Sequence, residues 1–313
     1  MFMTYRKYSL SLLLIQALFA VLLSVSPALA ATDNTAQKSF ASPEEAIKNL
    51  VQAARNNNIT EMAAILGPDS QEIVSSGDPV ADKSGRERFV NLYDEKIVIE
   101  GAETGWAVIS LGNEDYPFPI PVVKDGDVWR FDAEAGKEEL LNRRIGRNEL
   151  RVIEVLQAYV DAQREYAATD RDGDGILEFA QKFRSTPGQK DGLYWSTQEG
   201  EQESPFGPLA AEAAREGYTK EKENTALYGY HYRILKGQGK DADGGAFDYV
   251  VNGKMILGFA MVAYPAQYGA SGIMTFMVNH NGIVYQKDLG DDTDSIAAAM
   301  LNFNPDSSWS KVE

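Results

Sequence analysis

The strongest constraint on this chain is that apolar residues change from helical spacing to strand spacing twice along its length. From residue 42 to residue 95 apolar residues recur at helical spacing, as in Ile47, Leu50 and Val51. Short β-branched and aromatic runs follow as far as residue 131, separated by Gly, Asn and Asp. The same order, a helical pattern followed by strand patterns, occurs again between residues 133 and 287. Helices followed by a meander of strands predict an α+β protein.

Residues 42–148 are expected to form an N-terminal α+β half. Ser42-Pro43-Glu44-Glu45 offers a hydroxyl N-cap, a proline at the first helical position and a glutamate that can return the hydrogen bond. Four strands are expected, with a hairpin turn at Asp125-Gly126. They cover Ile97 to Glu100, Trp106 to Leu111, Phe118 to Val123 and Val128 to Phe131. This order of elements is similar to cystatin-like and nuclear-transport-factor-like folds.

Residues 149–313 are expected to form a C-terminal half, in which a long helix packs on an antiparallel sheet. The helical pattern runs from about Ala133 to Thr169. The clearest hairpin turns of the sheet are Asn252-Gly253 and Asn281-Gly282, because both residue types tolerate positive φ. The run from Met255 to Tyr264 would be apolar on both faces of a strand. This predicts a central strand that is covered on each side.

The first thirty residues have the features of a secretory signal peptide. Arg6 and Lys7 precede an apolar run from Leu10 to Val25, and the small residues Ala28 and Ala30 suit a cleavage site. An uncleaved anchor is the alternative. Residues 31–41 are polar and small, which predicts a tether, and no later apolar stretch is long enough to span a bilayer. We expect a mature periplasmic protein with no transmembrane span, with full secretion as the other possibility.

Composition excludes several functional classes. The chain has 46 acidic and 30 basic residues, a net charge of -16, and loss of Arg6 and Lys7 with the leader makes it -18. Nucleic acid is a poor partner for such a surface. The absence of cysteine removes thiol catalysis and disulfides, and the two histidines, His231 and His280, show no metal spacing. No serine lies in a motif that would activate it.

One acidic loop has the residue types of a cation site. The run from Asp170 to Glu178 places Asp170, Asp172 and Asp174 at alternate positions, and Glu178 follows at the ninth position. Ca²⁺ takes six to eight oxygen ligands, and Gly175 permits the sharp turn that this requires, as in the first half of an EF-hand loop. The twelfth position is a glutamine, so modest affinity is expected. A Mg²⁺ site and a solvated Asp/Gly turn are the alternatives.

The expected role of the ion is structural, because without a cation the clustered aspartates would repel one another. A second charged group consists of Arg143, Arg144, Arg147 and Arg151. These arginines could hold an anionic ligand or pair with carboxylates of the protein itself.

Several separated motifs give the chain a family resemblance. They are Ser76-Gly77-Asp78-Pro79-Val80-Ala81-Asp82, Pro117-Phe118-Pro119-Ile120-Pro121, Trp129-Arg130-Phe131-Asp132, Arg143-Arg144-Ile145-Gly146-Arg147-Asn148-Glu149-Leu150, Asp172-Gly173-Asp174-Gly175 and Val262-Ala263-Tyr264-Pro265. In order and content they resemble Domain of Unknown Function family 2950. The resemblance implies bacterial export and no catalytic residues. The second half also resembles pilin-type modules, although no hydrophobic N-terminal helix is attached at residue 149.

The functional expectation is a non-enzymatic periplasmic protein that binds or scaffolds an unknown envelope protein or ligand. A structural Ca²⁺ site is expected at Asp170, Asp172, Asp174 and Glu178. The competing interpretation is a hydrolase that acts on an envelope polymer, with paired carboxylates in a cleft between the halves.

Overall fold

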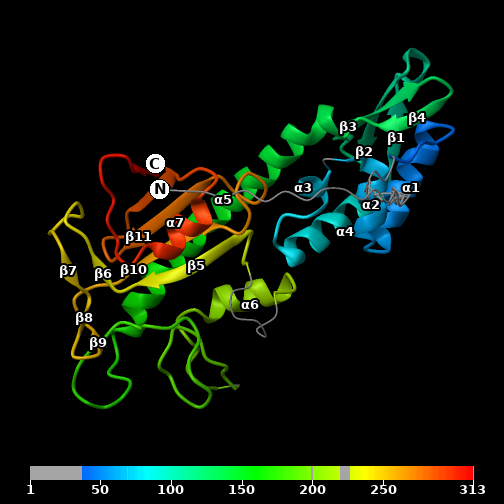
Figure 1. Ribbon diagram of the computed structural model, residues 1–313. Helices are drawn as coiled ribbons and strands as arrows, with labels where there is room; N and C mark the ends of the chain where they lie inside the picture. Colours follow the sequence, from blue (N-terminus) through cyan, green and yellow to red (C-terminus); the bar gives the residue numbers. More distant parts are fainter. Residues whose placement is uncertain (1–36, 69, 199, 219–225, 313) are drawn as a thin grey trace, which may run out of the picture. The chain divides into compact units, whose positions relative to one another are not determined.

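The computed structural model describes residues 37–68, 70–198, 200–218 and 226–312 (Figure 1). The predicted signal peptide, residues 1–30, and residues 31–36 of the predicted tether lie outside the described residues. Helices come first, an antiparallel meander follows, and a long helix then leads to a second antiparallel sheet. The predicted α+β class and order of elements are therefore confirmed.

The N-terminal half begins with helices. They are α1 (Pro43–Arg55), α2 (Ile59–Leu66), α3 (Gln71–Val74) and α4 (Pro79–Glu95). The hydroxyl of Ser42 accepts a hydrogen bond from the backbone N–H of Glu45 at 3.2 Å, as the cap motif predicts. The Glu45 carboxylate accepts one from the N–H of Ala41 at 2.8 Å. The apolar stripe of α1 faces inward, and Ile47 and Leu50 are buried.

A four-stranded antiparallel sheet completes this half. Its strands are β1 (Ile97–Glu100), β2 (Trp106–Leu111), β3 (Tyr116–Asp125) and β4 (Val128–Phe131), paired in sequence order, with the 3-10 turn η1 (Ala102–Thr104) after β1. The buried face of β2, with Ala107, Ile109 and Leu111, packs in one core with α1 and α2. Residues 37–41, within the predicted tether, lie against this half. Phe40 is buried and pairs with Trp129 of β4.

The long helix α5 (Ala133–Tyr166) has 34 residues and contributes to both halves. The Asp132 carboxylate caps it by accepting from the N–H of Ala135 at 3.2 Å. Its first turns lie so close to β3 that a Cβ on Gly136 would be 2.6 Å from the carbonyl oxygen of Pro119. Its later turns pack on the second sheet. The boundary expected at residues 148 and 149 falls inside this uninterrupted helix.

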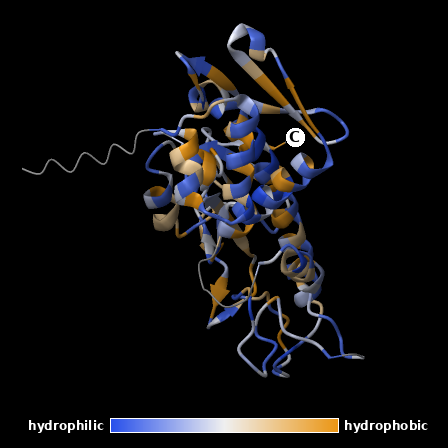
Figure 2. Ribbon diagram, turned by 90° about the vertical axis from the view of Figure 1, so that its right-hand side faces the viewer, coloured by the Kyte–Doolittle hydropathy of each residue, from blue (hydrophilic) through white to orange (hydrophobic). Residues whose placement is uncertain are grey.

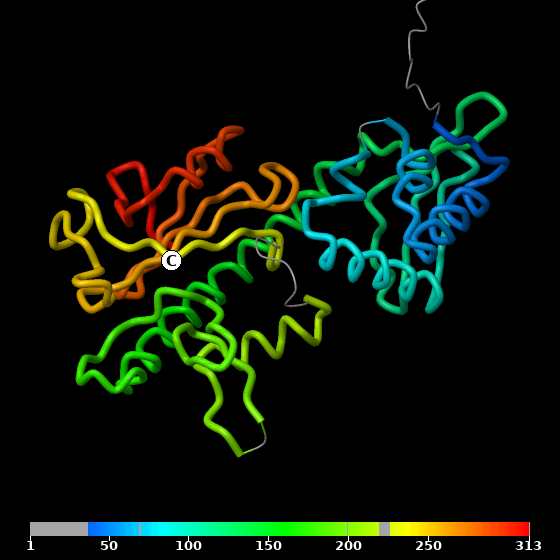
Figure 3. The backbone as a smooth tube through the Cα atoms, turned by 60° about the horizontal axis from the view of Figure 1, so that its bottom comes forward, coloured from blue at the N-terminus to red at the C-terminus, as the bar shows by residue number. Residues whose placement is uncertain are grey.

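The second sheet has five antiparallel strands in the order β13-β12-β11-β10-β5. They are β5 (Tyr230–Leu235), β10 (Ala260–Pro265), β11 (Met274–Asn279), β12 (Val284–Asp288) and β13 (Ser310–Lys311). Figure 3 shows the yellow to red part of the chain that contains them, beside the green turns of α5. Val152, Leu156 and Tyr159 of α5 share one core with β10 and β11. The helices carry both hydrophobic and hydrophilic residues, as expected for helices that bury one face (Figure 2).

Short elements surround this sheet. They are α6 (Gly207–Arg215), β6 (Gly237–Gln238), β7 (Phe247–Asp248), β8 (Val250–Val251), β9 (Lys254–Met255) and α7 (Thr293–Ala299). Asn252 and Gly253 have φ of 51° and 84°, and they form the predicted two-residue hairpin between β8 and β9. Asn281-Gly282 belongs to a longer connection, because β11 ends at Asn279 and β12 begins at Val284.

The expected strand from Met255 to Tyr264 is not continuous. Ile256 and Leu257 are exposed, and Gly258 has φ of 153° and is buried against Tyr249 and His280. Only β10, from Ala260 onward, joins the second sheet, where it lies between β5 and β11 and is almost wholly buried. The apolar run therefore predicted burial correctly from Ala260 onward, but it did not predict the break at Gly258.

Hydrogen bonds join elements of the two halves. The buried carboxylate of Asp78, at the start of α4, accepts from the Tyr218 hydroxyl and from the N–H of Gly229, both at 2.8 Å. The buried Asn148 amide of α5 donates to the carbonyl of Ser271 at 2.9 Å. Among the described helices, none combines the length and apolar character that crossing a bilayer requires.

Candidate functional site

The predicted acidic loop directly follows the end of α5. Asp170 organises it, because its two carboxylate oxygens accept from the N–H groups of Gly173 and Gly175, each at 2.8 Å. Both glycines have positive φ, 76° and 84°, which other residues adopt at a cost. The Asp174 carboxylate accepts from the N–H of Ile176 at 3.0 Å. The loop therefore folds back on itself, as the alternating Asp and Gly residues predicted.

This fold brings three of the four predicted ligands together. One carboxylate oxygen each from Asp170, Asp172 and Asp174 lie within 4.8 Å of one another. Opposite ligands of a Ca²⁺ ion with bonds of 2.3 to 2.6 Å are about 4.6 to 5.2 Å apart. The three aspartates could therefore hold a metal ion, and nothing in their geometry selects calcium over another hard cation.

A lysine already occupies the centre of negative charge. The Lys254 ammonium, from the β8–β9 hairpin, lies 2.7 Å from Asp172, 2.6 Å from Asp174 and 3.3 Å from Glu178. Its side chain is 19% exposed. Hydrogen bonds to Asp172 and Asp174 raise the pKa of Lys254, and the hydrogen bond from Lys254 lowers the pKa of Asp172. Glu178, the fourth predicted ligand, meets the aspartates through this lysine.

The expectation that these aspartates need a divalent cation is therefore incomplete, because the chain supplies a cation of its own. Lys254 lies 82 residues after Asp172 and was not predicted from the sequence as a partner of these carboxylates. The only local signal was its position directly after the Asn252-Gly253 turn, which gives no indication of what the side chain contacts.

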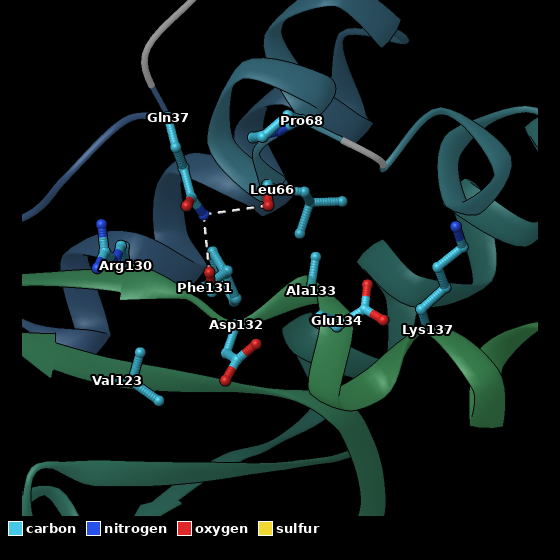
Figure 4. A pocket seen from close by; sticks show the side chains of 10 residues that line it. All are labelled: Gln37, Leu66, Pro68, Val123, Arg130, Phe131, Asp132, Ala133, Glu134 and Lys137. Atoms are coloured by element: carbon cyan, nitrogen blue, oxygen red, sulfur yellow. Dashed lines mark hydrogen bonds between the residues drawn. The ribbon is translucent and has the colours of Figure 1, made fainter.

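Two pockets lie in the N-terminal half. The smaller, with a volume of about 300 Å³, is lined by apolar residues and by polar and charged groups, most of which already have partners (Figure 4). The Gln37 amide donates to the carbonyls of Leu66 and Phe131 at 3.0 and 2.7 Å. Arg130 pairs with Asp125, and Lys137 pairs with Glu72. Four of the five polar or charged side chains that line this pocket therefore have partners within the described part of the protein, the exception being Glu134.

The larger pocket has a volume of about 660 Å³, within the range of small-molecule sites. Residues of α4, β3 and α5 line it. One face of α4 contributes Gly85, Phe89 and Leu92. Leu140, Arg143, Arg144 and Arg147 recur at helical spacing on α5 and line it as well. Phe89 and Phe118 are in contact, with ring centroids 5.2 Å apart, and form part of its apolar wall.

Three of the four arginines that the sequence singled out belong to this pocket. The fourth, Arg151, instead donates to Glu154 and Glu212 at 2.8 and 3.0 Å, and it also meets Glu216. Arg143 pairs with Glu139 at 2.6 Å. Arg151 and Arg143 therefore pair with carboxylates of the protein itself, which was one of the two alternatives for the arginine cluster. Arg144 and Arg147 have no carboxylate within ion-pair distance among the described residues.

The pocket was not predicted from the sequence. Phe89 and Leu92 fall within residues 42–95, where apolar residues recur at helical spacing, and this spacing does not distinguish a packed core from a pocket wall. A glycine in the middle of α4 was the available signal, because a helix interior disfavours Gly85 and a Cβ at this position would meet no atom within 4 Å.

Comparison with known proteins gives one match. Residues 37–312 match the family described as "Protein of unknown function (DUF2950)". Neither a curated protein nor a solved structure matches the chain. The likeness to cystatin-like and pilin-type modules therefore remains a resemblance in the order of elements.

Proposed function

The chain belongs to the DUF2950 family of proteins of unknown function, and from that premise we propose that it is an exported, non-enzymatic binding protein of the bacterial envelope. The observation that carries this proposal is the pocket of about 660 Å³ between α4, β3 and α5, which combines an apolar wall with polar groups at fixed positions. Export rests on the predicted signal peptide, residues 1–30.

Two glycines allow a direct test of pocket binding. Gly85 lines the pocket, and Gly146 lies in α5 outside it. Each has helical backbone, and a Cβ at either position would meet no atom within 4 Å. Gly85→Trp should place an indole in the pocket, whereas Gly146→Trp should place one in solvent.

The protein is exported from a bacterial host, purified and weighed by native mass spectrometry. We expect a retained small molecule in the wild type and in Gly146→Trp, and its loss in Gly85→Trp. Retention of the same molecule by Gly85→Trp, with unchanged stoichiometry, would place the binding site elsewhere.

We also propose a structural Ca²⁺ site at Asp170, Asp172, Asp174 and Glu178, with Lys254 as the competing cation. The short distances between the aspartates support it, and the lysine means that Ca²⁺ must displace an ammonium group. Lys254→Met should therefore bind Ca²⁺ more tightly than the wild type in calorimetric titration, and Asp172→Ala should bind it more weakly.

Thermal unfolding provides the second measurement for the ion site. Chelated Lys254→Met should melt at a lower temperature than the wild type and recover when Ca²⁺ is added, because a ligand of the native state raises its stability. Absence of heat and of any melting shift with Ca²⁺ in this variant would refute the ion site.

The hydrolase interpretation lacks comparable support. Five carboxylates line the two pockets: those of Asp82, Glu95 and Glu114 in the larger, and those of Asp132 and Glu134 in the smaller. Two of them have structural tasks, because Asp82 accepts hydrogen bonds from Ser76 at 2.7 and 2.9 Å and Asp132 caps α5. No hydrogen bond among the described residues joins two of the five into a pair for acid–base catalysis.

A further inference from the structure

The charges around the larger pocket are unlike those of the whole chain. Five arginines and three carboxylates line it, although the protein carries a net charge of -16. The arginines are Arg86 and Arg88 of α4 and Arg143, Arg144 and Arg147 of α5. A local excess of positive charge on an acidic protein raises the concentration of anions at that place.

Four of these guanidinium groups have no carboxylate partner among the described residues. Arg144 donates to the carbonyls of Glu72 and Ile73 at 2.6 and 2.5 Å, and Arg86 donates to the side-chain oxygen of Asn57 at 2.8 Å. These acceptors are neutral, so they fix the arginines without cancelling their charge. Arg88 and Arg147 form no hydrogen bond or ion pair within the described part of the chain.

The arginines also act on one another. Partial burial is the main cause that lowers the pKa of Arg144, and the charges of Arg147 and Arg86 lower it further, against the opposing influence of Asp82. Desolvation is likewise the main cause that lowers the pKa of Arg147, and the charge of Arg88 lowers it further. Like charges held this close favour binding of an anion between them.

The apolar and charged parts of the pocket occupy successive positions along α4. Asp82, Gly85, Arg86 and Arg88 line it first, Phe89 and Leu92 follow, and Glu95 lines it near the end of the helix. The first and last of these positions are 13 residues apart, which is about 20 Å along the helix. The pocket-lining face of α4 is therefore elongated, and between the acidic residues Asp82 and Glu95 at its two ends it changes from basic to apolar.

We propose that this pocket binds an anionic amphiphile, with its acidic headgroup at Arg88, Arg144 and Arg147 and its hydrocarbon tail against Phe89, Leu92 and Phe118. This inference rests on the proposed binding function and specifies its ligand class. A small, fully polar anion would leave the apolar wall in water, and a neutral hydrocarbon would leave the arginines without a counter-charge. An amphiphile satisfies both parts of the pocket.

Calorimetric titration of the full-length mature protein tests the proposal with probes that share one tail. Dodecanoate, dodecyl phosphate, dodecanol and dodecyltrimethylammonium are added below micelle-forming concentrations. We expect both anions to bind, and the tighter one identifies the headgroup as carboxylate or phosphate. The alcohol and the cation should bind at least about tenfold more weakly, as expected for the loss of a charge-assisted hydrogen bond.

Arg147→Gln and Arg88→Gln remove charge without breaking any hydrogen bond within the described part of the chain. Each should weaken dodecanoate binding about tenfold and leave dodecanol binding unchanged. Arg215→Gln is the matched control, because Arg215 lies on α6 outside the pocket. It should leave the binding of both probes unaltered. High salt should weaken dodecanoate binding to the wild type.

The outcomes separate this inference from the broader function. The anionic headgroup is refuted if dodecanol binds as tightly as dodecanoate. It is also refuted if Arg147→Gln changes the affinity for neither probe. The binding function survives that result if Gly85→Trp still abolishes binding. If no probe and no co-purified molecule depends on Gly85, both proposals fail.

Discussion

The buried carboxylate of Asp78 allows a quantitative test of how elements from the two halves are joined. Asp78 is the N-cap of α4 and accepts from the N–H groups of Val80 and Ala81 at 3.1 and 3.0 Å. It also accepts from Tyr218 and Gly229 at 2.8 Å. Asp78→Ala therefore removes a helix cap and, in addition, leaves two donors from distant sequence without their acceptor.

The expected magnitude follows from these contacts. Loss of an N-cap costs about 1 kcal/mol. Each buried donor left unpaired costs about 1 to 3 kcal/mol. Asp78→Ala should therefore lower the free energy of unfolding by about 3 to 7 kcal/mol, a large part of the roughly 5 to 15 kcal/mol that is typical of a folded domain.

Asp132→Ala is the matched control, because Asp132 caps α5 through a single bond to Ala135. It should cost only about 1 kcal/mol. Urea unfolding, followed by circular dichroism and tryptophan fluorescence, measures both variants. Tyr218→Phe should lie between them, since it removes one of the two distant donors. If Asp78→Ala costs no more than Asp132→Ala, Tyr218 and Gly229 do not depend on this carboxylate and the reasoning is wrong.

Three further predictions concern glycines, a histidine and export. Gly85→Ala should stabilise α4 by about 0.5 to 1 kcal/mol in urea unfolding. Gly136→Ala should destabilise the protein, because the new Cβ would lie 2.6 Å from the Pro119 carbonyl oxygen. If both variants change the free energy of unfolding in the same direction, the assigned packing is refuted. Burial lowers the pKa of His280 below 6.5, so stability should be lost as pH falls through 6.5 toward the folded-state pKa, where the unfolded state binds more protons. His280→Gln should flatten this pH dependence, and an unaltered profile in His280→Gln would contradict the assignment. Mass spectrometry of periplasmic protein should give Ala31 as the first residue, whereas an intact leader would favour the anchor.

Local sequence signals predicted local structure well. Ser42 caps α1, and Asn252-Gly253 forms the hairpin between β8 and β9, because a cap or a tight turn depends on a few adjacent residues. The run from Met255 to Tyr264 was predicted less well. Apolar character indicates burial, but the conformation at Gly258 depends on Tyr249 and His280, which pack against it from other segments.

In the candidate sites, too, features set by adjacent residues were predicted and features set by distant segments were not. The acidic loop was visible in the sequence because its ligands lie within nine residues of one another. Lys254 was not, since the sequence carries no record of which side chain approaches the loop from a hairpin. Arg144 and Arg147 were recognised as a basic cluster, but their pocket exists only because α4 and α5, from separate segments, line it together.

The continuity of α5 also bears on the order in which the protein acquires its structure. The first turns of this helix pack on β3, a strand that precedes them in the chain, so that contact can form early during synthesis. The buried Tyr159 instead donates to the carbonyl of Ala260, 101 residues further on. Until that segment has been made, the later turns of α5 expose an apolar face, and a chaperone that recognises such surfaces is expected to act at this stage.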